Sequence, residues 1–162
     1  MHKRKGFTLI EIIVVVAIIG ILASMIAVSV NTALKKARDT KRKVEISQIG
    51  RFISGSCYLP AAGAGEYDLA DLLVELRAAY PQYATILSQT PRDPGPGTSV
   101  QSFYRYLVTA DGKCALYANL ENDAEPITLS NMSAPTPDGG KGVFAAPTSG
   151  WNGSPKYFQV SN

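Results

Sequence analysis

The hydrophobic and polar positions divide the chain into two unlike regions. Residues 7–30 carry a single formal charge, Glu11, and no proline, whereas charged residues are spread through the rest of the chain. An α-helix of this length rises about 36 Å, which exceeds the roughly 30 Å hydrocarbon core of a bilayer. The pattern therefore predicts a membrane-spanning helix over residues 7–30.

The helical periodicity continues beyond this apolar run. Residues 31–56 contain no proline, and their apolar side chains recur mostly at three- and four-residue spacings. One helix from residue 7 to about 56 would be about 75 Å long, much longer than a bilayer is thick. Residues 31–56 are therefore expected to be an amphipathic continuation that packs on the rest of the chain. The apolar positions that define it are Val30, Leu34, Ala37, Val44, Ile46, Ile49 and Ile53.

Residues 57–162 have the mixed pattern of a small globular head. Its first predicted element is a helix over 68–80, where leucines recur on one face. Asp68 is a suitable N-cap residue, and Pro81 stops the helix because the residue before a proline disfavours the α conformation.

Strand-like runs follow in the second half of the head. Residues 103–109 and 114–120 are rich in aromatic and branched side chains, and the turn residues 110–113 between them predict a β-hairpin. A third strand over 156–160 would complete a small antiparallel sheet, and the proline- and glycine-rich residues 121–155 are expected to be loop. The predicted fold class is α+β, with a long N-terminal helix packed on a small antiparallel sheet.

Charge is segregated along the chain. Sixteen Lys and Arg against thirteen Asp and Glu give a net charge of +3, distributed as +3 over residues 1–6, +4 over residues 7–51 and −4 over residues 52–162. Basic residues before an apolar span favour a cytoplasmic N-terminus, which places the head outside the membrane.

A second group of basic residues follows the apolar run and is expected to line the exposed face of the helix just beyond the membrane. Anionic lipid or the acidic heads of neighbouring molecules are suitable counter-charges. The group lacks the interleaved aromatic residues typical of nucleic-acid binding, so nucleic acid is not an expected partner. It comprises Lys35, Lys36, Arg38, Lys41, Arg42 and Lys43.

Glu11 requires an explanation, because a carboxylate inside an apolar span costs about 2.5–3.5 kcal/mol on insertion scales. If the chain were cut after Gly6, the new α-ammonium group of Phe7 would lie four residues before Glu11, on the same helical face. The ammonium group of a neighbouring copy is a second possible partner. A solvated or protonated carboxylate near the membrane interface is the simplest alternative.

The residues around Glu11 match a known motif. The string Lys-Gly-Phe-Thr-Leu-Ile-Glu at positions 5–11, followed directly by the apolar run, resembles the N-terminus of type IV pilins and of the pseudopilins of type II secretion. The resemblance covers about the first fifty residues. It implies that a prepilin peptidase cuts after Gly6 and that the amine of Phe7 is then N-methylated. It also implies that Glu11 sets the axial register of subunits by pairing with the N-terminus of a neighbour.

This resemblance implies a structural subunit rather than an enzyme. The expected partners are copies of the same chain in a helical filament, the prepilin peptidase and N-methyltransferase, a pilus assembly platform, and membrane lipid before assembly. The expected location is the cytoplasmic membrane, followed by the cell surface. A secretion pseudopilin is the alternative, and a single-span anchor that presents a binding head is a different class, which would retain Met1.

A cleaved secretory signal is another interpretation of the N-terminal segment, since Ala23, Ser24 and Ala27 imitate a cleavage site. The apolar run is longer than the 7–15 residues of such signals, however, and this interpretation leaves Glu11 unexplained.

Two cysteines remain to be placed. Cys57 falls at the end of the long helix and Cys114 at the start of a predicted strand, and a disulfide between them is expected in an exported head. With His2 in the leader as the chain's histidine, two cysteines cannot complete a tetrahedral metal site, and no cofactor is expected.

A weaker local resemblance to the main type II secretion pseudopilin lies within the head. Pro-Arg-Asp-Pro at 91–94, followed by Tyr-Arg-Tyr at 104–106, is similar to its Asp-Pro segment and tyrosine-rich strand. Some of those relatives bind calcium in the loop between strands. Residues 121–125 supply carboxylate and amide oxygens, but their spacing does not match an EF-hand, and a solvated acidic turn is the alternative.

Overall fold

The computed structural model describes residues 7–53, 55–85 and 87–162. Helix α1 runs over Leu9–Ile53, so the expected long helix is confirmed. The chain divides into two compact units, the first ending at Lys35 and the second spanning Lys36–Asn162. Helix α1 contributes residues to both units, and each unit is described by itself below.

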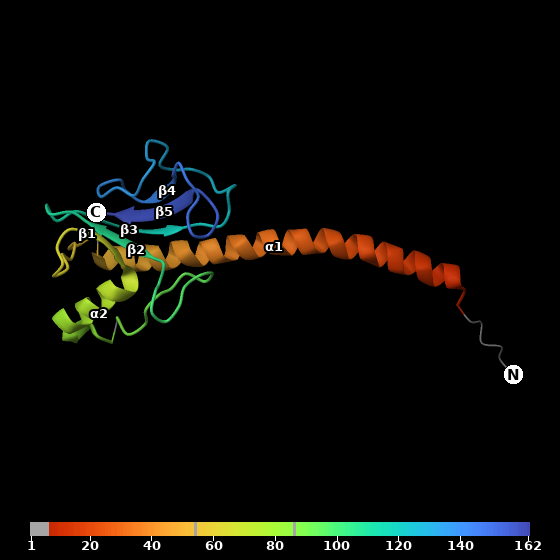
Figure 1. Ribbon diagram of the computed structural model, residues 1–162, viewed down its shortest axis with the longest axis horizontal. Coiled ribbons are helices and arrows are strands. Elements are labelled where there is room, and N and C mark those ends of the chain that lie inside the picture. The colour runs from red at the N-terminus through yellow and green to blue at the C-terminus, as the bar shows by residue number, and fades with distance from the viewer. Residues whose placement is uncertain (1–6, 54, 86) are drawn as a thin grey trace. The chain divides into compact units, whose positions relative to one another are not determined.

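The second unit contains one antiparallel sheet of five strands, in the order β1-β2-β3-β5-β4 (Figure 1). The predicted hairpin is confirmed, and the third predicted strand pairs with its second strand. The strands are β1 (Gly65–Asp68), β2 (Arg105–Val108), β3 (Cys114–Asn119), β4 (Gly142–Ala145) and β5 (Lys156–Ser161).

Two strands were not predicted. Strand β4 lies within residues 121–155, which the sequence pattern assigned entirely to loop, and that assignment is wrong at Gly142–Ala145. Strand β1 forms one edge of the sheet by pairing with β2, and β4 forms the other edge by pairing with β5. Both are four residues long, and their position in the sheet depends on partners distant in sequence.

The predicted short helix is confirmed as α2 (Leu69–Ala79), followed by the 3-10 turn η1 (Pro81–Tyr83). Asp68 is its N-cap, and one carboxylate oxygen, Oδ1, accepts a hydrogen bond from the Ala70 N–H at 2.9 Å. The Asp68 carboxylate also accepts hydrogen bonds from the backbone N–H groups of Ser102 and Phe103, so it connects the start of α2 to the approach to β2.

The hydrophobic core of the second unit lies between α1, α2 and one face of the sheet. Ile46 of α1 is fully buried there, and at Gly50 the helix comes so close to β5 that a Cβ atom would lie 2.7 Å from a methyl carbon of Val160. Glycine is therefore required at that crossing. The buried core side chains are Ile46, Leu69, Leu72, Leu73, Tyr104, Tyr106, Val108, Cys114, Leu116, Ala118, Leu120, Val143, Phe158 and Val160.

Candidate functional site

The N-terminal stretch of α1 is apolar and exposed. Every side chain described from residue 7 to residue 26 is exposed, and an 18-residue window of the helix has a mean hydropathy of 2.9 with none of it buried. A soluble protein rarely exposes an apolar surface of this extent unless a partner or a membrane covers it. By length and composition, this helix is suited to cross a bilayer.

Glu11 has a local partner at the start of this helix. Its Oε2 atom accepts hydrogen bonds from the Thr8 N–H at 2.8 Å and from the Thr8 hydroxyl at 2.7 Å. The Glu11 N–H in turn donates to Thr8 Oγ1 at 3.3 Å. This reciprocal pattern is a capping box, in which Thr8 is the N-cap residue and Glu11 the third helical residue.

The sequence contained the signal for this arrangement, a threonine followed three residues later by a glutamate, but it was not recognised among the expected partners of Glu11. The structure brings Phe7, Thr8 and Glu11 together at one helix end. Gly6 and the leader, residues 1–6, lie outside the described residues. Of the two residues at the expected cleavage point, the structure therefore describes Phe7 alone.

A second group of charges is buried inside the second unit. Arg42 was expected on the exposed face of α1, and that expectation is wrong because its side chain is fully buried. The face of α1 that turns toward the head carries Asp39, Arg42, Ile46 and Gly50, at helical spacings of three and four residues. The predicted apolar positions Leu34 and Val44 are instead about half exposed.

Three carboxylates surround the Arg42 guanidinium. Its Nε and Nη2 atoms donate to the two Asp93 oxygens at 2.9 and 2.6 Å, a bidentate pair. Its Nη1 atom donates to Asp39 at 2.7 Å, and its Nη2 atom lies 2.7 Å from Glu121. The isolated charge would be very unfavourable in this position, so the three carboxylates are what make the burial of Arg42 possible.

The same carboxylates order two loops of the head. Asp39 accepts hydrogen bonds from the backbone N–H groups of Glu121 and Asn122 at 2.9 Å each. Asp93 accepts further hydrogen bonds from the Gly95 N–H and the Asn152 side-chain amide, both at 2.8 Å. The Arg42 charge cluster, which we define as Asp39, Arg42, Asp93 and Glu121, therefore connects α1 to the head through directional contacts.

Electrostatics in the cluster favour the charged forms. Burial alone lowers the pKa of Arg42, but hydrogen bonds and charge from Asp93, with Glu121 and Asp39 acting in the same sense, raise that pKa above its usual value. Hydrogen bonds from Arg38 lower the pKa of Glu121 to about 2, with Arg42 contributing and burial opposing. Arg38 and Glu121 form a bidentate pair at 2.6 and 2.8 Å.

Two acidic residues of the segment 121–125 are already paired with basic side chains of α1. Glu121 is paired with Arg38 and Arg42, and Glu125 with Lys43. Within the part of the chain that the structure describes, no three His, Cys, Asp or Glu side chains are placed to hold a metal ion. A calcium ion in this loop would have to compete with these ion pairs.

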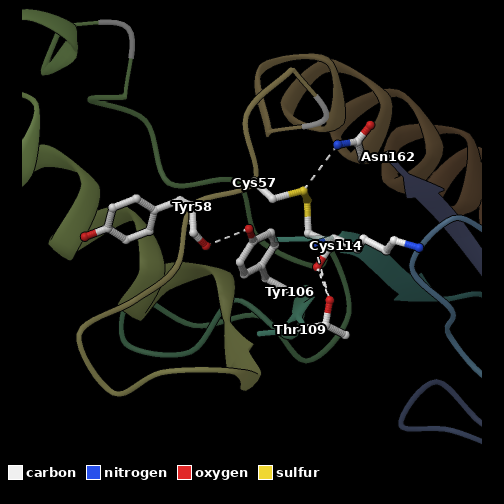
Figure 2. The surroundings of a disulfide bond; sticks show 7 residues. Cys57, Tyr58, Tyr106, Thr109, Cys114 and Asn162 are labelled. Carbon is white, nitrogen blue, oxygen red and sulfur yellow. Dashed lines mark hydrogen bonds between the residues drawn. A yellow bond between two sulfur atoms is a disulfide. The ribbon is translucent and has the colours of Figure 1, made fainter. Parts of the chain in front are cut away.

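The structure joins Cys57 and Cys114 by a disulfide, with a Cα–Cα distance of 5.7 Å (Figure 2). This bond connects the segment after α1 to the first residue of β3. Next to it, the Tyr106 hydroxyl donates to the Tyr58 carbonyl at 2.8 Å, and the Asn162 side-chain amide lies 3.7 Å from Cys57 Sγ. The C-terminal residue therefore lies beside the disulfide.

Comparisons with known proteins bear on the N-terminal segment. Residues 1–27 match the family model of the prokaryotic N-terminal methylation motif. The chain is also 50% identical over 40 residues to the type IV wide pilus major component PilA4 of Thermus thermophilus, a stretch that covers 25% of this chain and 30% of that protein. No solved structure matches the chain.

These matches show that the N-terminal segment is similar to that of the type IV pilin and pseudopilin family, so the resemblance seen in the sequence is confirmed. It is a family of structural subunits and not of enzymes. The chain spans less than a third of the length of the curated relative it matches, and the match does not extend over the whole of the head.

Proposed function

We propose that this chain is a structural subunit of a type IV pilus-like filament. The peptidase removes residues 1–6 after Gly6, the amine of Phe7 is methylated, and subunits then leave the membrane to pack helix against helix. The observation that carries this proposal is the methylation motif next to an apolar helix whose described surface is exposed. Lipid covers this surface before assembly, and neighbouring helices cover it afterwards.

Glu11 has two roles in this proposal. In the uncut chain its carboxylate is held by Thr8, which reduces the penalty of placing it in an apolar span. After cleavage, the Phe7 ammonium group of a neighbouring copy supplies a positive charge with which Glu11 pairs between subunits. Lipid is as apolar as a bundle of helices, so packing and this charge pairing, more than hydrophobic burial, favour association.

The head is expected outside the cytoplasmic membrane. Basic residues precede the apolar run in the sequence, which favours a cytoplasmic N-terminus. The disulfide between Cys57 and Cys114 fits an oxidising compartment, since such bonds are rare in the cytosol.

The first test is mass analysis of the N-terminus of protein purified from its own cells. The proposal predicts loss of residues 1–6 and the mass of one added methyl group on Phe7. Protein that retains Met1 would contradict the proposal and favour a single-span membrane anchor instead.

The second test is the assembly of Glu11→Ala. This variant should be cut and inserted in the membrane normally, yet yield far fewer filaments in material sheared from cells. Asp123→Ala, which removes an exposed carboxylate of the head, is the matched control and should assemble normally. Normal filament yield from Glu11→Ala would contradict the role of Glu11 in register.

A pseudopilin of a secretion machine is the second candidate, because the segments at 91–94 and 104–106 are similar to those of the main type II secretion pseudopilin. Deletion of the gene separates the two functions. Loss of long surface fibres in which this chain is the main component favours the pilus, whereas retention of exported proteins inside the cell, with no fibre lost, favours the pseudopilin.

A further inference from the structure

The chain contains two Asn-x-Ser sequons, the acceptor motif for N-linked glycosylation, at Asn131 and Asn152. Both lie in the head, between β3 and β5. A sequon can be modified in a folded protein where its amide nitrogen is accessible. The structure distinguishes the two sequons sharply on this criterion.

Asn131 is presented to solvent. It lies in a turn closed by the hydrogen bond from the Met132 N–H to the Leu129 carbonyl at 3.3 Å, and its side chain makes no hydrogen bond to the described residues. Asn131 and Ser133 are both exposed, whereas Met132 between them is half-buried. The Met132 sulfur lies 3.8 Å from the amide nitrogen of the buried Gln159.

The inward-facing methionine holds this turn in place. Met132 also sits against Gly139, where a Cβ atom would come within 2.7 Å of its terminal methyl group. Just before the turn, the N–H groups of Thr128 and Leu129 donate to the Val143 carbonyl of edge strand β4. The turn is therefore anchored by the segment before it and by Met132 within it, while Asn131 and Ser133 remain exposed.

Asn152 has the opposite environment. Its amide nitrogen donates to the Asp93 carboxylate and to the Asn119 carbonyl, both at 2.8 Å, so both amide hydrogens are engaged. The third residue of this sequon, Ser154, is fully buried, and its hydroxyl accepts a hydrogen bond from the Lys156 N–H. Modification of Asn152 would break its hydrogen bond to the Arg42 charge cluster.

We propose that Asn131 is an N-glycosylation site of this protein and that Asn152 is not. A membrane oligosaccharyltransferase transfers a glycan from a polyprenyl diphosphate carrier: the Asn131 Nδ2 atom forms a bond to C1 of the first sugar, and the bond between C1 and the diphosphate oxygen breaks. The amide loses one proton to a base, and the polyprenyl diphosphate leaves. No oxidant or reductant is needed. This inference rests on the proposed function, because the head must reach the compartment where such carriers are used.

Trypsin separates the two sequons and so allows a direct test. The chain has no Lys or Arg between Lys113 and Lys141, or between Lys141 and Lys156, so peptides 114–141 and 142–156 contain one sequon each. After reduction of the Cys57–Cys114 disulfide, full-length protein from its own cells should yield peptide 114–141 with a glycan mass on Asn131 and peptide 142–156 unmodified.

Variants test the chemistry of the linkage. Asn131→Gln and Ser133→Ala should each lose the added mass from peptide 114–141, and Ser133→Thr should keep it. All three should retain the melting temperature of the unsubstituted protein after enzymatic removal of glycan, since both positions are exposed. This control excludes misfolding as the cause of a loss.

The possible results separate this inference from the proposed function. An unmodified peptide 114–141, a glycan on Asn152, or added mass that survives Asn131→Gln or Ser133→Ala would each overturn the glycosylation site. The same digests report the N-terminus. A cut and methylated Phe7 with an unmodified Asn131 overturns the inference alone, whereas an N-terminal peptide that begins at Gly6, where trypsin cuts an unprocessed chain after Lys5, contradicts the proposed function.

Discussion

Two stretches of helix α1 hold charged groups in opposite ways. Near its N-terminus, Glu11 is bonded by a residue three positions away, and no other part of the chain is required. Farther along, Arg42 is bonded by Asp93, a residue 51 positions away, as well as by its near neighbour Asp39. The first arrangement requires only that the first turn of the helix is formed, whereas the second requires that the head is folded against the helix.

This difference in bonding fits what each stretch of the helix does: the N-terminal stretch is proposed to change its surroundings, and the later stretch stays packed on the head. The N-terminal stretch is proposed to exchange lipid for neighbouring helices, so a charge that depended on a fixed tertiary partner would be exposed during that transfer. The stretch beyond Lys36 belongs to the same compact unit as the head, and there directional contacts set one position of the helix against the sheet. The following predictions test this comparison, in order of decreasing effect.

The largest effect is expected from Arg42→Met. The substitution preserves much of the apolar stem but leaves the buried carboxylates of Asp39 and Asp93 without their counter-ion. Removing one partner of a buried ion pair costs about 4 kcal/mol, so the unfolding midpoint of the head should fall strongly. The midpoint is measured by urea unfolding of the full chain in detergent, followed by near-ultraviolet circular dichroism.

A matched control shows whether this loss is specific. Lys36→Met removes an exposed charge from the same helix and should change the stability by less than about 0.5 kcal/mol. The N-terminal stretch should keep its helical signal in both variants. Equal midpoints for Arg42→Met and Lys36→Met would show that the head does not depend on the Arg42 charge cluster.

The next effect concerns the disulfide. Replacing both Cys57 and Cys114 by alanine should lower the stability of the head by about 3 kcal/mol, because the bond closes a long loop with a sequence separation of 57. Reduction of the unsubstituted protein should lower its melting temperature to that of the double alanine variant. Assembly through the N-terminal stretch should be retained at temperatures where the head stays folded. A head that melts at the same temperature with and without reductant would rule out this contribution.

A smaller effect is expected from pH, through Glu121. Its pKa is lowered to about 2 in the folded protein, below an ordinary value of about 4.5, so the unfolded state binds more protons between these values. The stabilisation from this group is present above about pH 4.5 and is lost as the pH falls toward 2. Melting temperatures over this range should fall less steeply for Glu121→Gln than for the unsubstituted chain. Identical slopes for the two proteins would contradict the assignment.

The smallest effect is expected from Thr8→Val, which removes the hydroxyl from the capping box. Loss of an N-cap side chain costs about 1 kcal/mol, so amide hydrogen exchange should accelerate in the first turn of α1 and nowhere in the head. Thr8→Ser keeps the hydroxyl and should exchange at the original rate. Faster exchange in the head of Thr8→Val would show that the two stretches are not independent.

Local signals in the sequence predicted most of the fold. The Asp68 cap with Pro81 predicted α2, and the turn at 110–113 predicted the hairpin of β2 and β3, because each depends on residues that are close in sequence. Strands β1 and β4 were missed, since four residues of each carry little periodicity and their pairing is set by distant partners.

Only part of the candidate site was predicted from the sequence. The methylation motif and Glu11 were found from the sequence, and the capping partner Thr8 was available there but overlooked. The burial of Arg42 had no local signal. A run of basic residues resembles a solvated surface unless the acidic side chains that approach it are known, and Asp93 and Glu121 approach it only through the folded head.

The Arg42 charge cluster also determines where this molecule can be divided and recombined. A hybrid subunit joined after Lys35 would carry Arg38, Asp39, Arg42 and Lys43 together with the loops they bind. A hybrid joined at the end of α1, after Ile53, would combine the head of one parent with the basic residues of another. Several acidic groups of the head loops would then lack their counter-ions. Exchange of heads between relatives, whether by recombination or by design, should therefore succeed at the first junction and fail at the second.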